Sequence, residues 1–318
     1  MSSVGRTTAH ALRLVFVVRG SHHQHFQRTL NDPMPDTPPL LRIRDLKIDF
    51  RRHDGPPTQA VKGLSLDLKQ GESIAIVGES GSGKSAMALS LARLLPEPQA
   101  SITASELSIA GHHILNMTEK ELRKVRGKEI AYVFQEPTTS LNPVLTVRTQ
   151  IGEAVALHRP EVKDRDAEIL AWLNKVGITE PEKRLRAYPH ELSGGMQQRV
   201  MIAMALCCQP KLLIADEPTT ALDVTIQKQI MELLASLRRE LDMSLILITH
   251  NFGIIRGVAD RVAVMFRGQI VETGTTEKVL NNPQHPYTQA LLDCVPRMGA
   301  KKARLRTIDY AALESASA

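Results

Sequence analysis

A glycine-rich loop gives the first chemical signal in the sequence. Residues 78–85 read GESGSGKS, which fits G-x-x-x-x-G-K-[ST] between the apolar strand SIAIV and a helical stretch. Such a loop turns its N–H groups inward, where they and the helix start bind phosphate oxygens. A glycine-rich turn without a ligand is the weaker alternative, because the Lys-Ser pair stands in register between the strand and the helix. The residues expected to bind nucleotide phosphates are Gly78, Glu79, Ser80, Gly81, Ser82, Gly83, Lys84, Ser85 and Ala86.

Within this loop, two side chains carry separate chemistry. Lys84 can reach the β- and γ-phosphates of a nucleotide, and the hydroxyl of Ser85 can bind Mg²⁺. The loop alone predicts nucleotide binding without naming the reaction.

Two carboxylates follow an apolar strand later in the chain. The stretch KLLIADEP ends in Asp216 and Glu217. A buried parallel sheet delivers such residues to its C-terminal edge, where α/β sheets bind their ligands. Asp216 fits a Mg²⁺ partner through water, and Glu217 could polarise a water molecule for attack on the γ-phosphate. A helix-capping acid pair is the alternative, and the phosphate loop in the same chain favours catalysis.

Two further strand ends carry weaker signals. The strand SLILIT is followed by His250, whose imidazole could hydrogen-bond the γ-phosphate at the same sheet edge. Gln135 closes IAYVFQ, and its carbonyl could ligate Mg²⁺ or orient water. From residue type alone, His250 could instead be an ordinary polar loop residue, and Gln135 an ordinary surface residue.

The elements that must position these residues follow an α/β pattern. LRIRDLKIDF alternates as a half-buried strand does, and SLDLKQGESIAIVG predicts two strands around a Gln-Gly turn. KLLIAD, SLILIT and RVAVMF are apolar strands separated by helical stretches, which indicates a buried, mostly parallel sheet. Residues from about 119 to 200 are predicted to form an inserted helical subdomain. Within it, residues from about 148 to 186 are almost wholly helical, with breaks at Pro160 and Gly177.

Composition narrows the class of protein. The 318 residues are 42% hydrophobic and 23% charged, as in soluble globular proteins, and only 3% aromatic. The net charge of +6 gathers in residues 1–33 and 297–306, so the near-neutral body argues against a nucleic-acid-binding face. Residues 1–39 are predicted to be a disordered extension, with a possible start near Met34. The basic stretch 297–306 is interpreted as a solvated tail, and contact with anionic lipid is a further hypothesis.

Cysteines and apolar runs indicate a reducing compartment and no membrane span. The three cysteines form no CxxC pair, and no apolar run approaches the roughly 20 residues that a transmembrane helix needs.

A second glycine-rich motif, LSGGMQQRV at residues 192–200, contains no carboxylate, histidine or cysteine. Its glycines allow close backbone approach, and its serine hydroxyl and helix-start N–H groups face an anion.

Together and in this order, the motifs resemble those of the ATP-binding subunits of ABC transporters, over about residues 40–296. GESGSGKS resembles the Walker A loop, Phe134–Gln135 the Q-loop and LSGGMQQR the signature. LLIADE resembles Walker B, Ala221–Asp223 the D-loop, and His250 the switch histidine. The resemblance implies an α/β P-loop NTPase of the ABC ATPase fold, with a mostly parallel RecA-like core sheet, an antiparallel β subdomain and an inserted α-helical subdomain. Residues 40–283 would form this domain, and residues 284–318 a C-terminal importer-group extension and basic tail.

The family mechanism then implies a role for each residue. Two cassettes would form a head-to-tail dimer, with each ATP between the Walker A loop of one and the signature of the other. Glu217 would be the catalytic base, His250 its transition-state partner and Lys84 a third catalytic residue. Mg²⁺ would be held by Ser85, Gln135 and Asp216; Asp223 would communicate across the dimer; and Phe50 would stack on adenine unless it is a core aromatic. The signature residues expected to meet the partner's ATP are Leu192, Ser193, Gly194, Gly195, Met196 and Gln197.

Three longer stretches narrow the family. FQEPTTSLNPVLTV, DEPTTALDVTIQ and HPYTQALL resemble the oligopeptide/dipeptide and nickel importer group. This implies an ATPase at the cytoplasmic face of a bacterial inner membrane, driving uptake of di- or oligopeptides or a solute such as nickel. Its partners would be two integral-membrane permeases, a second ATPase subunit that is a paralogue and, indirectly, a substrate-binding protein. Many members carry a C-terminal cysteine cluster, but only Cys294 follows Cys208 here, so no iron–sulfur cluster is expected.

Two other functions compete with import. A soluble ABC ATPase acting on nucleic acid or the ribosome is opposed by the single cassette and the near-neutral body, and we expect no nucleic-acid partner. A catalytically dead regulatory cassette is opposed by the presence of Lys84, Glu217 and His250.

Overall fold

The computed structural model describes residues 38–52, 54–220 and 222–294. The predictions made for residues 1–37 and for the basic stretch 297–306 lie outside the described residues, as does Ala221 of the D-loop.

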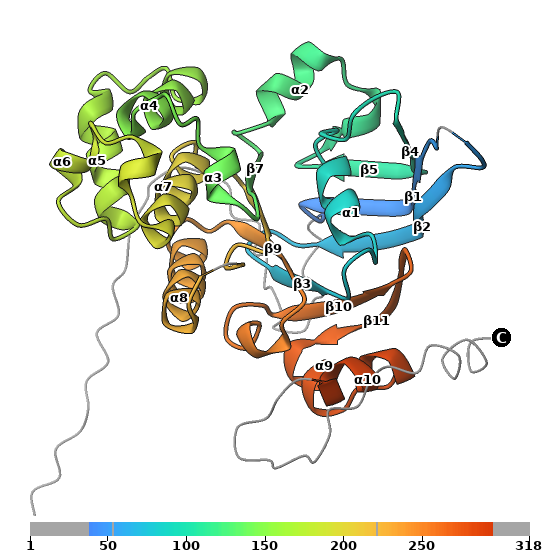
Figure 1. Cartoon of the computed structure of the whole chain (residues 1–318). Coiled ribbons are helices and arrows are strands. Elements are labelled where there is room, and N and C mark those ends of the chain that lie inside the picture. Colours follow the sequence, from blue (N-terminus) through green and yellow to red (C-terminus); the bar gives the residue numbers. More distant parts are fainter. Residues whose placement is uncertain (1–37, 53, 221, 295–318) are drawn as a thin grey trace, which may run out of the picture. The chain divides into compact units, whose positions relative to one another are not determined.

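A six-stranded sheet forms the centre of the described chain (Figure 1). Its order is β11-β10-β3-β9-β8-β7, and every neighbouring pair is parallel except β10 with the edge strand β11. All residues of β3 and β9 are buried, so both faces of these strands are covered, and their sequences are apolar apart from Ser73, Ser244 and Thr249 at the strand ends. The predicted mostly parallel sheet is confirmed. The strands are β3 (Ser73–Val77), β7 (Ile130–Val133), β8 (Leu212–Asp216), β9 (Ser244–Thr249), β10 (Arg261–Phe266) and β11 (Gln269–Thr275).

A smaller antiparallel sheet has the order β2-β1-β5-β6, with β4 also paired to β1. The predicted strands around the Gln-Gly turn are present, but they belong to different sheets, because β2 ends in the antiparallel sheet and β3 starts in the parallel one. The strands are β1 (Leu41–Phe50), β2 (Thr58–Leu68), β4 (Ala100–Thr103), β5 (Glu106–Ile109) and β6 (His112–His113).

The predicted helical stretch is interrupted by one strand. β7 lies inside residues 119–200 and pairs with β8 at the edge of the large sheet. The helices α3 to α7, which contact one another, start after this strand (Figure 1). The expected breaks are present, since α4 ends at His158 and α5 at Lys175. These helices are α3 (Pro137–Ser140), α4 (Val147–His158), α5 (Arg165–Lys175), α6 (Pro181–Arg184) and α7 (Gly194–Leu206).

The remaining helices flank the sheets. They are α1 (Lys84–Ser90), α2 (Glu119–Val125), α8 (Val224–Glu240), α9 (Thr276–Asn281) and α10 (Pro286–Cys294), with short 3₁₀ helices at Ile114–Asn116, Pro189–Glu191 and Phe252–Ile254.

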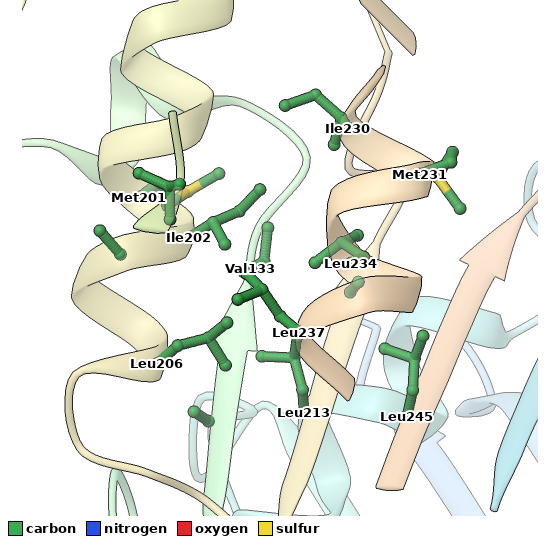
Figure 2. Packing of buried hydrophobic residues seen from close by; sticks show 14 of the residues in the cluster. Val133, Met201, Ile202, Leu206, Leu213, Ile230, Met231, Leu234, Leu237 and Leu245 are labelled. Carbon is green, nitrogen blue, oxygen red and sulfur yellow. The ribbon is translucent and has the colours of Figure 1, made fainter. Parts of the chain in front are cut away.

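Alternate residues of the parallel strands serve two different cores. On one face, Ile74 and Ile76 pack with α1 and the antiparallel sheet. On the other, Ala75 and Val77 belong to the core of α4, α5, α7 and α8. Figure 2 shows the second core, where side chains of α7 and α8 meet those of β7, β8 and β9. Because successive side chains of a strand point to opposite faces, each parallel strand packs against both hydrophobic cores, and the sheet lies between them.

Candidate functional site

A cavity of about 810 Å³ opens where the glycine-rich loop and the C-terminal ends of β8 and β9 meet. Its walls come from the loop and the start of α1, from the ends of three strands, and from the C-terminal helix α10. The lining residues are Ala60, Gly78, Glu79, Ser80, Gly81, Gly83, Lys84, Ser85, Ala86, Gln135, Glu217, Thr220, His250 and Leu291. The structure thus brings eight of the nine predicted loop residues to one cavity, and Ser82 is buried behind it.

Two glycines of the loop are required by close backbone approach. A Cβ atom on Gly78 would collide with the carbonyl oxygen of Met265, and one on Gly83 with that of Ala60. Gly83 also has a φ of 102° and immediately precedes α1. The loop therefore lies against the chain on its outer side, which leaves its inner side for a ligand.

The ammonium group of Lys84 is held inside the loop. Nζ donates to the carbonyl oxygens of Gly78 at 2.8 Å and Glu79 at 2.7 Å, and the residue is only 5% exposed. Burial lowers the pKa of Lys84, while nearby carboxylates, Glu217 first among them, act in the opposite direction. A buried cation beside a ring of backbone amides is suited to an anion such as a phosphate.

Asp216 ends β8 with one carboxylate oxygen unused. Its Oδ1 is buried and has no hydrogen-bond partner among the described residues. Burial raises the pKa of Asp216, and a hydrogen bond with Ser85 lowers it. An orphaned buried carboxylate oxygen beside a hydroxyl fits the oxygen ligands that Mg²⁺ prefers. Among the described residues, no group of three or more His, Cys, Asp or Glu side chains could hold a metal ion.

Glu217 is fixed by three side chains from different parts of the chain. Its Oε1 lies 3.0 Å from Nδ1 of His250, and its Oε2 accepts from Nε2 of Gln135 at 3.1 Å and from the hydroxyl of Thr220 at 3.0 Å. The backbone of Glu217 is left-handed, with a φ of 44°, and its N–H still donates to Ile248 of the next strand. Strain of this kind in a residue other than glycine persists where the surroundings hold it, often at functional sites.

The second glycine-rich motif lies outside the cavity. The residues Leu192, Ser193, Gly194, Gly195, Met196 and Gln197 are absent from its lining. The Ser193 side chain instead caps α7 by accepting the N–H of Met196, and Gln197 donates to backbone oxygens of Pro189 and Leu192. Gly194 and Ser193 are exposed. The motif is therefore a capped helix start outside the cavity that the chain's own phosphate loop lines.

Asp216, Asp223 and Phe50 are also absent from the cavity lining. Asp223 caps α8, where it accepts the N–H of Ile226 at 2.9 Å. Phe50 ends β1, pairs with Ala100 of β4 and packs on the core of the antiparallel sheet. Its role toward adenine stays a prediction.

Three lining residues were not predicted from the sequence. Ala60 and Leu291 enter the cavity from distant segments, and Thr220 follows Glu217 by three residues. Thr220 lies in the recognisable stretch DEPTTALD and Leu291 in HPYTQALL. Neither sequence pattern, however, indicates which of its residues lines a cavity.

Comparison with known proteins identifies the family. Residues 61–220 match the family model described as ABC transporter. The chain is also 48% identical, over 85% of its length, to the dipeptide transport ATP-binding protein DppD of Bacillus subtilis, of which it covers 81%. The chain belongs to the ABC transporter ATP-binding family. Residues 271–316 of this ABC ATPase match a second model, the C-terminal region of oligopeptide/dipeptide transporters, which places it in that group.

Other relatives share the cassette within longer proteins. The ABC ATPase is 55% identical to the peptidoglycan transport ATP-binding protein YejF of Agrobacterium fabrum over 82% of its own length, but it spans only 48% of that protein. It is 50% identical to the oligopeptide transport ATP-binding protein OppD of Bacillus subtilis, over 81% of its length and 72% of OppD.

Solved structures confirm the fold. The dimeric ATP-binding cassette MJ0796, in a post-hydrolysis state with ADP and Pi, has a TM-score of 0.65 and 28% identity over 74% of this chain and 98% of its own. The ABC ATPase cassette fold predicted from the motifs is therefore confirmed. No helix among the described residues combines the length and apolar character that a membrane crossing requires.

Proposed function

We propose that this ABC ATPase drives the import of peptides or a related small solute through separate membrane permeases. The proposal is supported by its group and by relatives whose names refer to dipeptide, oligopeptide and glutathione transport. Its partners would be two permeases and a second cassette that is a paralogue, with a substrate-binding protein acting indirectly. Its place would be the cytoplasmic face of a bacterial inner membrane. Nickel, raised by the motif resemblance, remains a candidate solute.

The cavity at the glycine-rich loop is the proposed ATP site. The loop amides and Lys84 would bind the phosphates, while Ser85, Asp216 and Gln135 would hold Mg²⁺. When bound, Mg²⁺ neutralises charge on the phosphate oxygens. The amide of Gln135 donates to Glu217 and leaves its carbonyl oxygen as the atom suited to a cation.

One observation carries the assignment as a hydrolase. Glu217 is held by its three partners at the wall of the same cavity as Lys84. Its carboxylate is the group best placed to take a proton from a water that attacks the γ-phosphate. His250, whose side chain is 61% exposed, would contact the γ-phosphate once ATP is bound. The proposal therefore names Glu217 as the base, with Lys84 and His250 as catalytic partners.

The position of the signature motif supports a composite site. Residues 192–197 line no part of the chain's own cavity, yet Ser193 and Gly194 are exposed at the start of a helix. Such a helix start attracts an anion. We propose that it closes on the ATP of a second cassette, with Asp223 near the same junction.

Replacing Glu217 by glutamine tests this function directly. Glu217→Gln keeps the shape of the side chain but replaces one carboxylate oxygen by an NH₂ group, which removes the proposed base. We expect ATP hydrolysis to fall by at least about 100-fold while ATP binding, measured by titration calorimetry, stays near that of the wild type. ATP should then hold the variant in a cassette dimer, visible by light scattering, with the paralogous cassette supplied if this chain alone stays monomeric.

Two results would count against the proposal. Wild-type turnover in Glu217→Gln would remove Glu217 as the base. Absence of ATP binding by the wild-type chain would remove the nucleotide site altogether. Uptake of labelled dipeptides, oligopeptides, glutathione and nickel by cells with and without the gene would then identify the solute.

A further inference from the structure

The C-terminal helix reaches the phosphate loop through one side chain. Tyr287 on α10 is fully buried, and its hydroxyl accepts the N–H of Glu79 at 3.2 Å across 208 residues of sequence. Leu291, one turn further along the helix, lines the same cavity as the loop. The contact joins two separately matched regions, because Tyr287 lies within the oligopeptide/dipeptide region at 271–316 and Glu79 within the ABC transporter region at 61–220.

Short-range contacts fix Tyr287 in place. Glu272 on β11 accepts the N–H of Gln284 at 2.8 Å and that of His285 at 3.0 Å. Nδ1 of His285 in turn accepts the N–H of Tyr287 at 3.1 Å. The rings of Tyr287 and Phe266, which ends β10, lie 4.2 Å apart between centroids. The turn of the chain at Gln284 and His285, just before α10, therefore sets the position of one hydroxyl group.

The peptide bond that Tyr287 contacts also holds Lys84. The Gly78 carbonyl and the Glu79 N–H belong to one planar unit, whose two polar groups point in opposite directions. Tyr287 binds the N–H, and the Lys84 ammonium binds the carbonyl at 2.8 Å. A rotation of this peptide would break both hydrogen bonds together. Further along the loop, the carbonyl of Ser82 accepts the backbone N–H of Gly268 at 2.9 Å.

We infer that Tyr287 is a positioning residue for the phosphate loop, which keeps the Gly78–Glu79 peptide turned so that Lys84 stays poised for phosphate. The inference rests on the proposed function, in that this loop binds ATP. A loop fixed in its binding conformation loses less freedom when ATP binds, so its affinity is higher. The competing explanation is that a buried tyrosine hydroxyl simply needs a partner. The two explanations differ in whether nucleotide affinity or only stability changes when the hydroxyl is removed.

Tyr287→Phe in the full-length chain removes the hydroxyl and keeps the ring. We expect the dissociation constant and the KM for ATP to rise about three- to tenfold, with kcat within about twofold of the wild type. Tyr132→Phe is the matched control, because its partly buried hydroxyl is also hydrogen-bonded to backbone, donating to the carbonyl of Ala88 in α1 at 2.6 Å. It should lower the melting temperature similarly and leave ATP affinity unchanged.

The possible outcomes distinguish a failure of the Tyr287 inference from a failure of the proposed function. Equal ATP affinity in Tyr287→Phe and the wild type would overturn the inference, as would equal weakening in both phenylalanine variants. A wild-type chain that binds no ATP would instead overturn the proposed function. If Tyr287→Phe fails to fold, Glu272→Gln serves as the second variant, since it loosens the turn and leaves the hydroxyl present. It should weaken ATP binding in the same direction, and unchanged affinity there would overturn the inference.

Discussion

Oε1 of Glu217 lies 3.0 Å from Nδ1 of His250, so one contact joins the ends of the neighbouring strands β8 and β9. Both oxygens of the carboxylate have partners in the chain alone, because Gln135 and Thr220 take the other one. The strands thus supply the proposed catalytic group and the residues that orient it.

Removing the imidazole should separate binding from hydrolysis. In His250→Ala, Glu217 keeps its contacts with Gln135 and Thr220, so the cavity stays formed. We expect hydrolysis to fall by about 100-fold and ATP affinity to change by less than about threefold. Phosphate-release kinetics and titration calorimetry give the two numbers. His113→Ala, on the exposed strand β6, is the control and should behave as the wild type. A parallel loss of binding in His250→Ala would contradict this division.

The signature motif should matter only in the assembled state. Gly194→Asp places a carboxylate at the proposed contact with the partner's ATP, and a Cβ there meets only Leu222, at 3.7 Å. We expect unchanged ATP affinity in the monomer and hydrolysis reduced by at least about 100-fold, by the loss of oriented donors. Lys84→Ala should instead lose ATP binding itself. If Gly194→Asp impaired monomer binding as strongly as Lys84→Ala, the composite site would be wrong.

The unpaired oxygen of Asp216 predicts a metal-dependent defect. In Asp216→Asn the shape is kept, but the charge that faces the proposed cation is lost. The Mg²⁺ concentration for half-maximal hydrolysis should rise by about tenfold or more, while binding of metal-free ATP stays the same. Titrating Mg²⁺ at fixed ATP measures the shift. An unaltered Mg²⁺ requirement would remove Asp216 from the metal site.

A hydrogen-bond cluster at the start of β3 predicts a pH dependence of stability. Burial raises the pKa of Asp260, but bonds from Ser73 and Arg238 outweigh it and hold the pKa below its usual 3.8. Because the folded pKa is depressed, the stabilisation is complete above about pH 4 and disappears as the pH falls through the folded pKa. Asp260→Asn should therefore melt below the wild type at about pH 6, and the difference should shrink towards about pH 3. A constant difference across this range would speak against it.

The packing of α8 predicts unequal costs on one helix. Leu234 is fully buried between α7 and the parallel sheet (Figure 2), whereas Leu233 is only partly buried. Leu234→Ala should lower the free energy of unfolding by about 2–5 kcal/mol, and Leu233→Ala by less. Urea unfolding followed by circular dichroism measures both. Equal losses in the two variants would show that the difference in burial between Leu234 and Leu233 does not determine the cost.

The sequence predicted the parts of the fold that depend on local pattern. Continuous apolar runs indicated β3, β8, β9 and β10, and the helix breaks followed from Pro160 and Gly177. The strand β7 was also recognisable in EIAYVF, but periodicity does not tell which sheet a strand joins. The bounds of about 119 to 200 for the helical subdomain therefore enclosed this strand, although β7 pairs with β8 in the large sheet.

The site residues also fall into those that a local sequence pattern could predict and those that it could not. Lys84, Glu217, His250 and Gln135 could be predicted because each stands at a strand end or in a loop with a recognisable pattern, and the cavity brings them together. The contact of Tyr287 with Glu79 could not be predicted, because no local pattern links residues 208 positions apart. Phe50 was chosen as an aromatic residue at the end of the strand LRIRDLKIDF, and it is not among the cavity-lining residues, whereas Ala60 and Leu291 from other segments are.

The reach of α10 into the loop affects where the chain can be cut. A truncation at residue 283 would retain the Walker, signature and switch motifs, so any motif search would accept it as a complete cassette. It would nevertheless discard Pro286–Cys294, and with this helix the acceptor for the Glu79 amide and one wall of the cavity. A shortened form of this chain that keeps the phosphate loop in its described surroundings therefore has to extend beyond residue 283, through α10.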